Sequence, residues 1–96
     1  MNRSEKVSVV MSVYNAEKTI ENSINSILNQ TYKNLEFLIV DDCSTDKTFE
    51  KLNLFANISN IKIFQNQENI GLTKSLNSLI TKATGNYIAR QDADDF

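Results

Sequence analysis

The sequence predicts an α/β fold in three layers, with helices on both faces of a mostly parallel sheet. Four short apolar segments rich in β-branched residues alternate with three segments whose apolar residues recur at helical spacing. The first strand segment, VSVVMSV at 7–13, has no polar gap for a solvent side, which is typical of a strand buried on both faces. Strands that alternate with helices over short links favour parallel pairing. We therefore expect residues 1–96 to form a single domain.

The predicted strands span 7–13, 35–40, 61–64 and 87–90, and each of the three intervening helices has one apolar face. The residues of these faces are Ile20, Ile24, Ile27 and Leu28; Phe49, Leu52 and Phe55; and Leu72, Leu76, Leu79, Ile80 and Ala83. Asn15 is a candidate cap for the first helix, and the segment 44–46 for the second. Gly71 opens the third helix, and Gly85 is placed to end it in a left-handed cap.

The composition excludes several classes of function. Ten Lys and Arg residues are scattered among twelve Asp and Glu, so no basic stripe indicates a nucleic-acid partner. The chain has no histidine, which excludes a His-based triad or His-ligated metal within it. No apolar run approaches the roughly 20 residues of a transmembrane segment. The lone Cys43 cannot form an internal disulfide, which fits a cytoplasmic location.

Acidic, amide and aromatic residues follow the predicted strands. If the strand order is 3-2-1-4, ligands bind at the carboxyl ends, where the order reverses between the first and fourth strands. The segments that meet there are Tyr14–Asn15, Asp41–Asp42, 66–69 and Asp92–Asp95. A ring can stack on a base, a carboxylate can bind a base or ribose, and an acid pair can hold a metal that binds a diphosphate. Because the chain lacks the glycine-rich phosphate motifs, a metal is expected to hold the phosphates.

Taken singly, these residues also have structural explanations: a solvated strand end, a turn, a helix cap or a ring at the edge of the core. A D-x-D triplet alone recurs by chance. The presence of such groups after every predicted strand favours a common site.

Two segments resemble the N-terminal part of family 2 glycosyltransferases of the GT-A fold: VSVVMSVYNAEKTIENSINSILNQTYKNLEFLIVDDCSTDKT and NIGLTKSLNSLITKATGNYIARQDADD. The resemblance covers 7–95, and YNAE, VDDCSTDKT, NIG and GNYIARQDADD in this order and spacing form a specific pattern. It implies a Rossmann-like α/β/α fold that binds a nucleotide-diphospho-sugar, with UDP as the expected nucleotide.

The resemblance also implies roles for single residues. The backbone of Ser12–Tyr14 would line the nucleobase pocket, with Glu17 in support. Asp42 would accept a hydrogen bond from the N3–H of uracil, and Asp41 would lie beside the ribose. Asn69 would approach the base.

The segment Asp92-Ala93-Asp94 matches the DXD motif of the family. Asp94 would ligate Mg²⁺ or Mn²⁺, Asp92 would contact the ribose or the metal shell, and Asp95 would face the donor sugar. Lys74 and Arg90 are candidate contacts for the diphosphate or sugar.

The chain departs from the family pattern at Val13, where proline is common, and at Cys43, where glycine is common. Family members continue past DXD into an acceptor-binding half that supplies the catalytic base. We therefore expect this chain to be the donor half of a metal-dependent, inverting glycosyltransferase, with no turnover alone. The acceptor would be a glycan or lipid-linked hydroxyl, reached in the cytoplasm at the inner membrane face. Self-association through apolar surface that the missing half would cover is a further hypothesis.

Two alternatives stay open at this point. One is a receiver-type or phosphoryl-transfer domain, although that reading predicts an acid pair after the first strand, where Tyr14 and Asn15 stand. The other is a non-catalytic nucleotide-binding or interaction module.

Overall fold

The computed structural model describes residues 5–29 and 33–91. The sheet has the order β3-β2-β1-β4, and every strand pair is parallel. The predicted strand order is therefore confirmed, and β2 and β3 each extend one residue beyond the predicted end. The elements in chain order are β1 (Val7–Val13), α1 (Ile20–Leu28), β2 (Leu35–Asp41), α2 (Thr48–Asn53), β3 (Ile61–Gln65), α3 (Leu72–Lys82) and β4 (Tyr87–Arg90).

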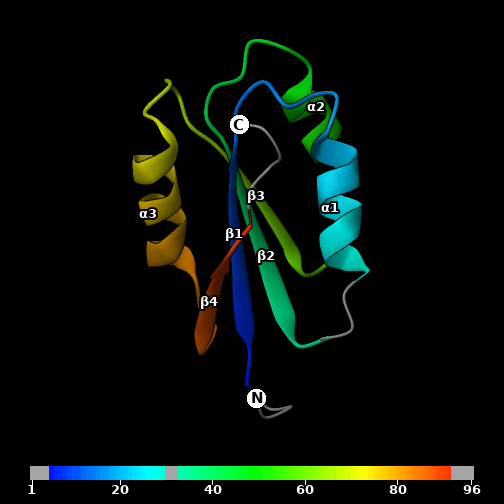
Figure 1. Cartoon of the computed structure of the whole chain (residues 1–96), viewed down its shortest axis with the longest axis vertical. Coiled ribbons are helices and arrows are strands. Elements are labelled where there is room, and N and C mark those ends of the chain that lie inside the picture. Colours follow the sequence, from blue (N-terminus) through cyan, green and yellow to red (C-terminus); the bar gives the residue numbers. More distant parts are fainter. Residues whose placement is uncertain (1–4, 30–32, 92–96) are drawn as a thin grey trace.

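The helices cover both faces of the sheet, as predicted. Figure 1 shows α1 and α2 on one side and α3 on the other, with the carboxyl end of β1 at the top. Alternate residues of β1 serve the two layers: Met11 belongs to the cluster under α1 and α2, whereas Val10 packs with Leu76 and Leu79 under α3. Six of the seven residues in each of β1 and β2 are buried, which is the pattern of strands covered on both faces.

A buried carboxylate organises the amino edge of the sheet. Glu36 of β2 is 3% exposed and accepts hydrogen bonds from Ser8 Oγ at 2.6 Å and Thr84 N at 2.7 Å. Lys6 and Lys62 place their ammonium groups 3.5 and 3.4 Å from its Oε1. One side chain therefore links β1, β2, β3 and the loop that follows α3.

The charge of Glu36 is stabilised despite its burial. Burial alone would raise the pKa of this carboxyl group, but hydrogen bonds from Ser8 and Thr84 and the charge of Lys6 lower it to about 2. A carboxyl group whose pKa is lower in the folded chain contributes stability above its unfolded pKa, and this stability is lost as the pH falls toward about 2.

Two predicted helix caps are wrong. Asn15 does not cap α1, because the chain makes a turn first and α1 begins after Thr19. Gly85 does not form a left-handed cap: α3 ends in an extended residue, Ala83, and Gly71 is the glycine with positive φ in the described chain. Gly85 instead allows a close backbone approach, because a Cβ there would lie 2.6 Å from Ser8 Oγ.

The Glu36→Gln variant tests the amino-edge carboxylate. We expect the free energy of unfolding of the parent to fall by on the order of 3 kcal/mol between pH 5 and pH 2 through Glu36 alone. The variant should lack this component and should be less stable at pH 7. Urea unfolding followed by circular dichroism across this pH range measures both effects. Glu50→Gln, at an exposed position on α2, is the matched control, and a Glu36→Gln profile that parallels the parent contradicts the prediction.

The Gly85→Ala variant tests the close approach of the α3–β4 loop to β1. The added methyl group would lie 2.8 Å from both Lys6 O and Ser8 N, so we expect a loss of about 1–3 kcal/mol in unfolding free energy. Because these two contacts are with backbone, adding Ser8→Ala should not restore the stability. Equal urea midpoints for Gly85→Ala and the parent would show that the loop moves away without cost.

Candidate functional site

The loops that follow β1, β2 and β3 meet at the carboxyl edge of the sheet. A backbone hydrogen bond from Asp42 N to Val13 O at 2.8 Å joins the ends of β1 and β2, and one from Asn66 N to Asp41 O at 2.9 Å joins the ends of β2 and β3. The last residue described after β4, Gln91, donates to Val10 O at 3.0 Å. Three of the four segments that the sequence predicted to converge therefore lie at one edge (Figure 1), and the fourth, Asp92–Asp95, lies outside the described residues.

Asp41 and Asn15 fix the loop between β2 and α2. Asp41 is fully buried, and its two carboxylate oxygens accept from Ser44 Oγ at 2.5 Å and Ser44 N at 3.0 Å. Asn15, at φ 50°, accepts from Thr45 N at 2.8 Å and donates its own N–H to Ser44 Oγ at 2.9 Å. The loop after β1 and the loop after β2 thus hold each other in place.

A second set of bonds joins the same two loops beside α2. Asp46 accepts from Thr48 N at 2.9 Å and from the Thr48 hydroxyl, but the N-cap of α2 is Lys47 and not one of the predicted residues 44–46. Thr48 Oγ1 in turn accepts from Ala16 N at 2.7 Å, and Asp46 accepts from Glu17 N at 3.4 Å. Burial would raise the pKa of Asp46, but the bonds from Thr48 and Glu17 outweigh burial and lower it.

Asp42 holds the loop between β3 and α3. Its carboxylate accepts from Ile70 N at 2.8 Å, Gly71 N at 2.9 Å and Asn66 Nδ2 at 3.0 Å. Asp42 is 1% exposed, because these donors surround its carboxylate. The contact with uracil that the resemblance implies for Asp42 stays a prediction.

The other predicted binding residues differ in how accessible they are. Ser12 is buried, and its Oγ has no hydrogen-bond partner within the described part of the chain. Tyr14 and Glu17 are half-buried, whereas Asn69 and Lys74 are exposed. Asn69 also donates to the carbonyl oxygen of Asp42 at 3.4 Å. Tyr14, Glu17, Asn69, Lys74 and the exposed Arg90 are therefore the described residues of the predicted set whose side chains are accessible.

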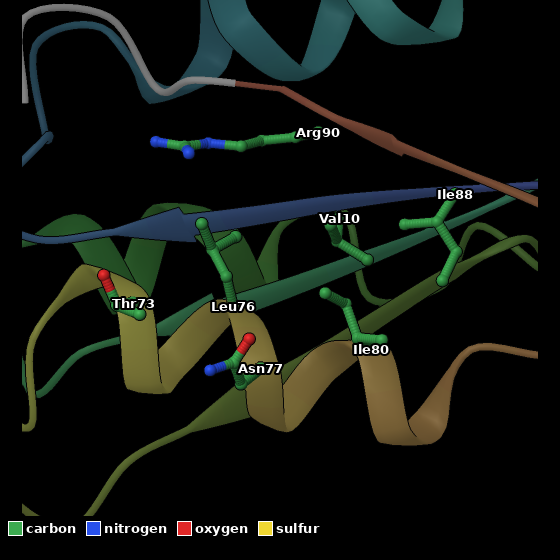
Figure 2. A pocket seen from close by; sticks show the side chains of 7 residues that line it. All are labelled: Val10, Thr73, Leu76, Asn77, Ile80, Ile88 and Arg90. Carbon is green, nitrogen blue, oxygen red and sulfur yellow. The ribbon is translucent and has the colours of Figure 1, made fainter.

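Arg90, the last residue of β4, lies at a groove between β4 and α3. This cavity of about 240 Å³ is lined by Val10, Thr73, Leu76, Asn77, Ile80, Ile88 and Arg90. In Figure 2 the Arg90 side chain extends toward the end of α3 that holds Thr73. The groove is smaller than the roughly 300 Å³ at which ligand pockets begin, so it does not by itself accommodate a nucleotide sugar.

The predicted metal ligands Asp92 and Asp94, together with Asp95, lie outside the described residues. Within 5–29 and 33–91, no three or more Asp, Glu or Cys side chains come together as a metal site. Asp41 and Asp42 do not fit that role either, because hydrogen bonds within the chain already occupy their oxygens. The metal role that the sequence predicted for Asp92 and Asp94 stays a prediction.

The sequence predicted that Asn15 and Asn66 lie at this edge, but it did not indicate that Asn15, Ser44, Thr48 and Asn66 join the loops by hydrogen bonds. The positive φ of Asn15 and of Cys43, at 61°, gives no signal in a single sequence beyond the general tolerance of Asn for this conformation.

The fold and the convergence of these loops define a nucleotide-sugar-transferase type of α/β domain. The family model of glycosyl transferase family 2 matches residues 8–96. The chain belongs to glycosyl transferase family 2, which removes support from the receiver-type alternative.

Individual relatives agree with this assignment. EpsE of Bacillus subtilis (strain 168) is 50% identical over 97 residues, which cover 99% of this chain and 35% of EpsE. The Escherichia coli UDP-Glc:alpha-D-GlcNAc-diphosphoundecaprenol beta-1,3-glucosyltransferase WfgD is 44% identical over 93% of this chain and 35% of its own length. The chain thus spans about a third of these relatives.

A solved structure shares the fold. The mannosyltransferase PcManGT from Pyrobaculum calidifontis, in complex with GDP-Man and Mn²⁺, matches with a TM-score of 0.87 at 28% identity. The match covers 97% of this chain and 29% of PcManGT. The predicted GT-A fold is confirmed.

None of the described helices is long and apolar enough to cross a membrane.

Asn15 offers a test of the loop junction. We expect Asn15→Ala to lower the free energy of unfolding more than Asn15→Gly, by about 1 kcal/mol, because a Cβ at positive φ is strained. Both variants lose the acceptor for Thr45 N, so their difference isolates the backbone conformation. Urea unfolding of the two variants measures it. Equal stabilities would show that residue 15 leaves the left-handed region when the side chain is removed.

Proposed function

We propose that this chain is the donor-nucleotide part of a glycosyltransferase that moves a sugar from a nucleotide-diphospho-sugar to an acceptor hydroxyl. The observation that carries the proposal is that the loops after β1, β2 and β3 are joined at one edge of the sheet. In the sequence, the DXD segment follows β4 after one residue, Gln91. Parallel α/β sheets bind ligands at this edge. A UDP-sugar is the proposed donor, with a glycan or lipid-linked acceptor, in keeping with the name of WfgD.

The accessible side chains suggest a division of roles. In this proposal Tyr14 stacks on the base, with Glu17 in support and the Ser12–Tyr14 backbone lining the pocket. Asn69 approaches the base from the loop after β3. Asp41 lies beside the ribose, and Lys74 and Arg90 contact the diphosphate or the sugar.

The chemistry would be a direct, inverting displacement. An acceptor hydroxyl attacks the anomeric carbon, a carboxylate base takes its proton, and the nucleoside diphosphate leaves. The base is expected in the part of the longer relatives that this chain does not match. Asp92 and Asp94 would hold Mg²⁺ or Mn²⁺, which when bound neutralises charge on a diphosphate, and Asp95 would face the donor sugar.

Calorimetric titration with UDP tests the proposal. We expect weak binding in the presence of Mn²⁺ and at least a tenfold loss of affinity when EDTA removes the metal, because the diphosphate then lacks a counter-charge. Asp94→Asn should abolish the difference between the two conditions.

Glu50→Gln, at an exposed position on α2 outside the predicted binding residues, should behave as the parent in both titrations. Absence of UDP binding, or equal binding with and without Mn²⁺, would refute metal-dependent donor binding by this chain.

A further inference from the structure

The side-chain amide of Asn66 links two elements at the carboxyl edge. Asn66 is the first residue after β3, and its backbone N–H donates to Asp41 O at 2.9 Å. Its Nδ2 carries two hydrogens and donates to Asp42 Oδ1 at 3.0 Å and to Ser75 Oγ at 2.9 Å. Ser75 is fully buried on α3. The Asn66 side chain therefore bridges the end of β2 and the first turns of α3, from a backbone that β2 already holds.

The two oxygens of the Asp42 carboxylate have unequal numbers of donors. Among the described residues, Oδ1 accepts from Asn66 Nδ2 and from Ile70 N. Oδ2 accepts from Gly71 N alone in the same part of the chain. Each oxygen of an ionised carboxylate offers about two acceptor sites. Oδ1 is therefore saturated, whereas Oδ2 keeps one site for a further donor.

The Asn66 amide fixes which oxygen is saturated. The torsion about the Cβ–Cγ bond of an Asp side chain is broad and roughly two-fold, so the torsion alone does not fix the plane of the carboxylate. The bond from Asn66 is charge-assisted, and the amide that donates it is also bonded to Ser75. Rotation of the Asp42 carboxylate would break this bond, so the amide holds Oδ1 in place.

We propose that Asn66 is a positioning residue of the donor site, which acts through Asp42 by holding Oδ1 so that Oδ2 receives the N–H of the base. Ser75 supports Asn66 by accepting the second amide hydrogen. The inference rests on the proposed function, because it takes over the contact between Asp42 and the N3–H of uracil that the family resemblance implies. It adds two residues to which the resemblance gave no role in binding.

Calorimetric titration of Asn66→Ala with UDP and CDP, both in the presence of Mn²⁺, tests this role. Uracil carries a hydrogen on N3 and cytosine does not, so UDP alone can donate to Asp42 there. We expect Asn66→Ala to lower the affinity for UDP about tenfold, as for the loss of one hydrogen bond to a charged group, and the affinity for CDP by less than about twofold. Asn25→Ala, which removes an exposed amide on α1, is the matched control and should bind both nucleotides as the parent does.

A double-mutant cycle separates action through Asp42 from direct contact with the ligand. In an Asp42→Asn background, Asn66→Ala should change the affinity for UDP by less than about twofold, because the carboxylate that it orients is gone. A second loss of about tenfold in this background overturns the proposal, since Asn66 would then act on the ligand itself. Where the double variant binds too weakly to titrate, the comparison of UDP with CDP decides the role.

The comparison of UDP with CDP also excludes a merely structural role. Equal losses for the two nucleotides in Asn66→Ala overturn the proposal, and faster hydrogen exchange at Ile70 and Gly71 would assign the losses to a loosened loop. An unchanged affinity for UDP overturns it as well. If Asn66→Ala does not fold, Ser75→Ala gives the same comparison, with a selective but smaller loss of UDP affinity expected.

Failure of this inference can be told from failure of the proposed function. A parent chain that binds UDP and CDP equally overturns the positioning role of Asn66 and leaves donor binding intact. A parent chain that does not bind UDP refutes the proposed function, and the positioning role fails with it.

Discussion

The structure depends on buried carboxylates that accept hydrogen bonds from backbone N–H groups at both edges of a parallel sheet. Parallel strands have no tight turn between them, so each connecting loop needs another source of order. Asp42 fixes the loop after β3 by accepting from Ile70 N, and Glu36 fixes the loop after α3 by accepting from Thr84 N. A carboxylate with several charge-assisted bonds fixes more backbone per side chain than a neutral group does. This explains how a chain with two glycines and no proline keeps ordered loops.

The buried carboxylates at the two edges of the sheet have different roles. At the amino edge, Glu36 lies beside Lys6 and Lys62 and links β1, β2, β3 and the loop after α3. At the carboxyl edge, Asp41, Asp42 and Asp46 bond to loops whose outward side chains, Tyr14 and Asn69, are accessible. Asp41, Asp42 and Asp46 therefore fix the loops that carry the accessible side chains.

Much of the architecture could be predicted from apolar patterning, because both faces of β1 and β2 are buried and the helices have single apolar faces. The strand order 3-2-1-4, assumed in locating the ligand site, is the observed order, whereas the DXD assignment came from the resemblance to the family and stays a prediction. The details of the loops could not be predicted in the same way. Gly85 suggested a left-handed cap, but its role is set by the distance to Ser8 across 77 positions. Asn15 suggested a cap but bonds to a loop some 30 positions later. Such contacts exist only once the sheet has formed.

Because β1 pairs with both β2 and β4, it makes contacts over two very different sequence separations, which affects the order in which the sheet forms. The contacts of β1 with β2 join residues 28 positions apart, and those with the start of β4 join residues 80 apart. Closing the longer loop costs about 0.9 kcal/mol more entropy than closing the shorter one if it forms from an open chain. Once β2, β3 and α3 have formed, however, only the short Ala83–Asn86 link separates β4 from the folded part of the chain. Folding is therefore least costly when β4 joins last, and the strand that leads into DXD is the one whose addition waits for the rest of the sheet.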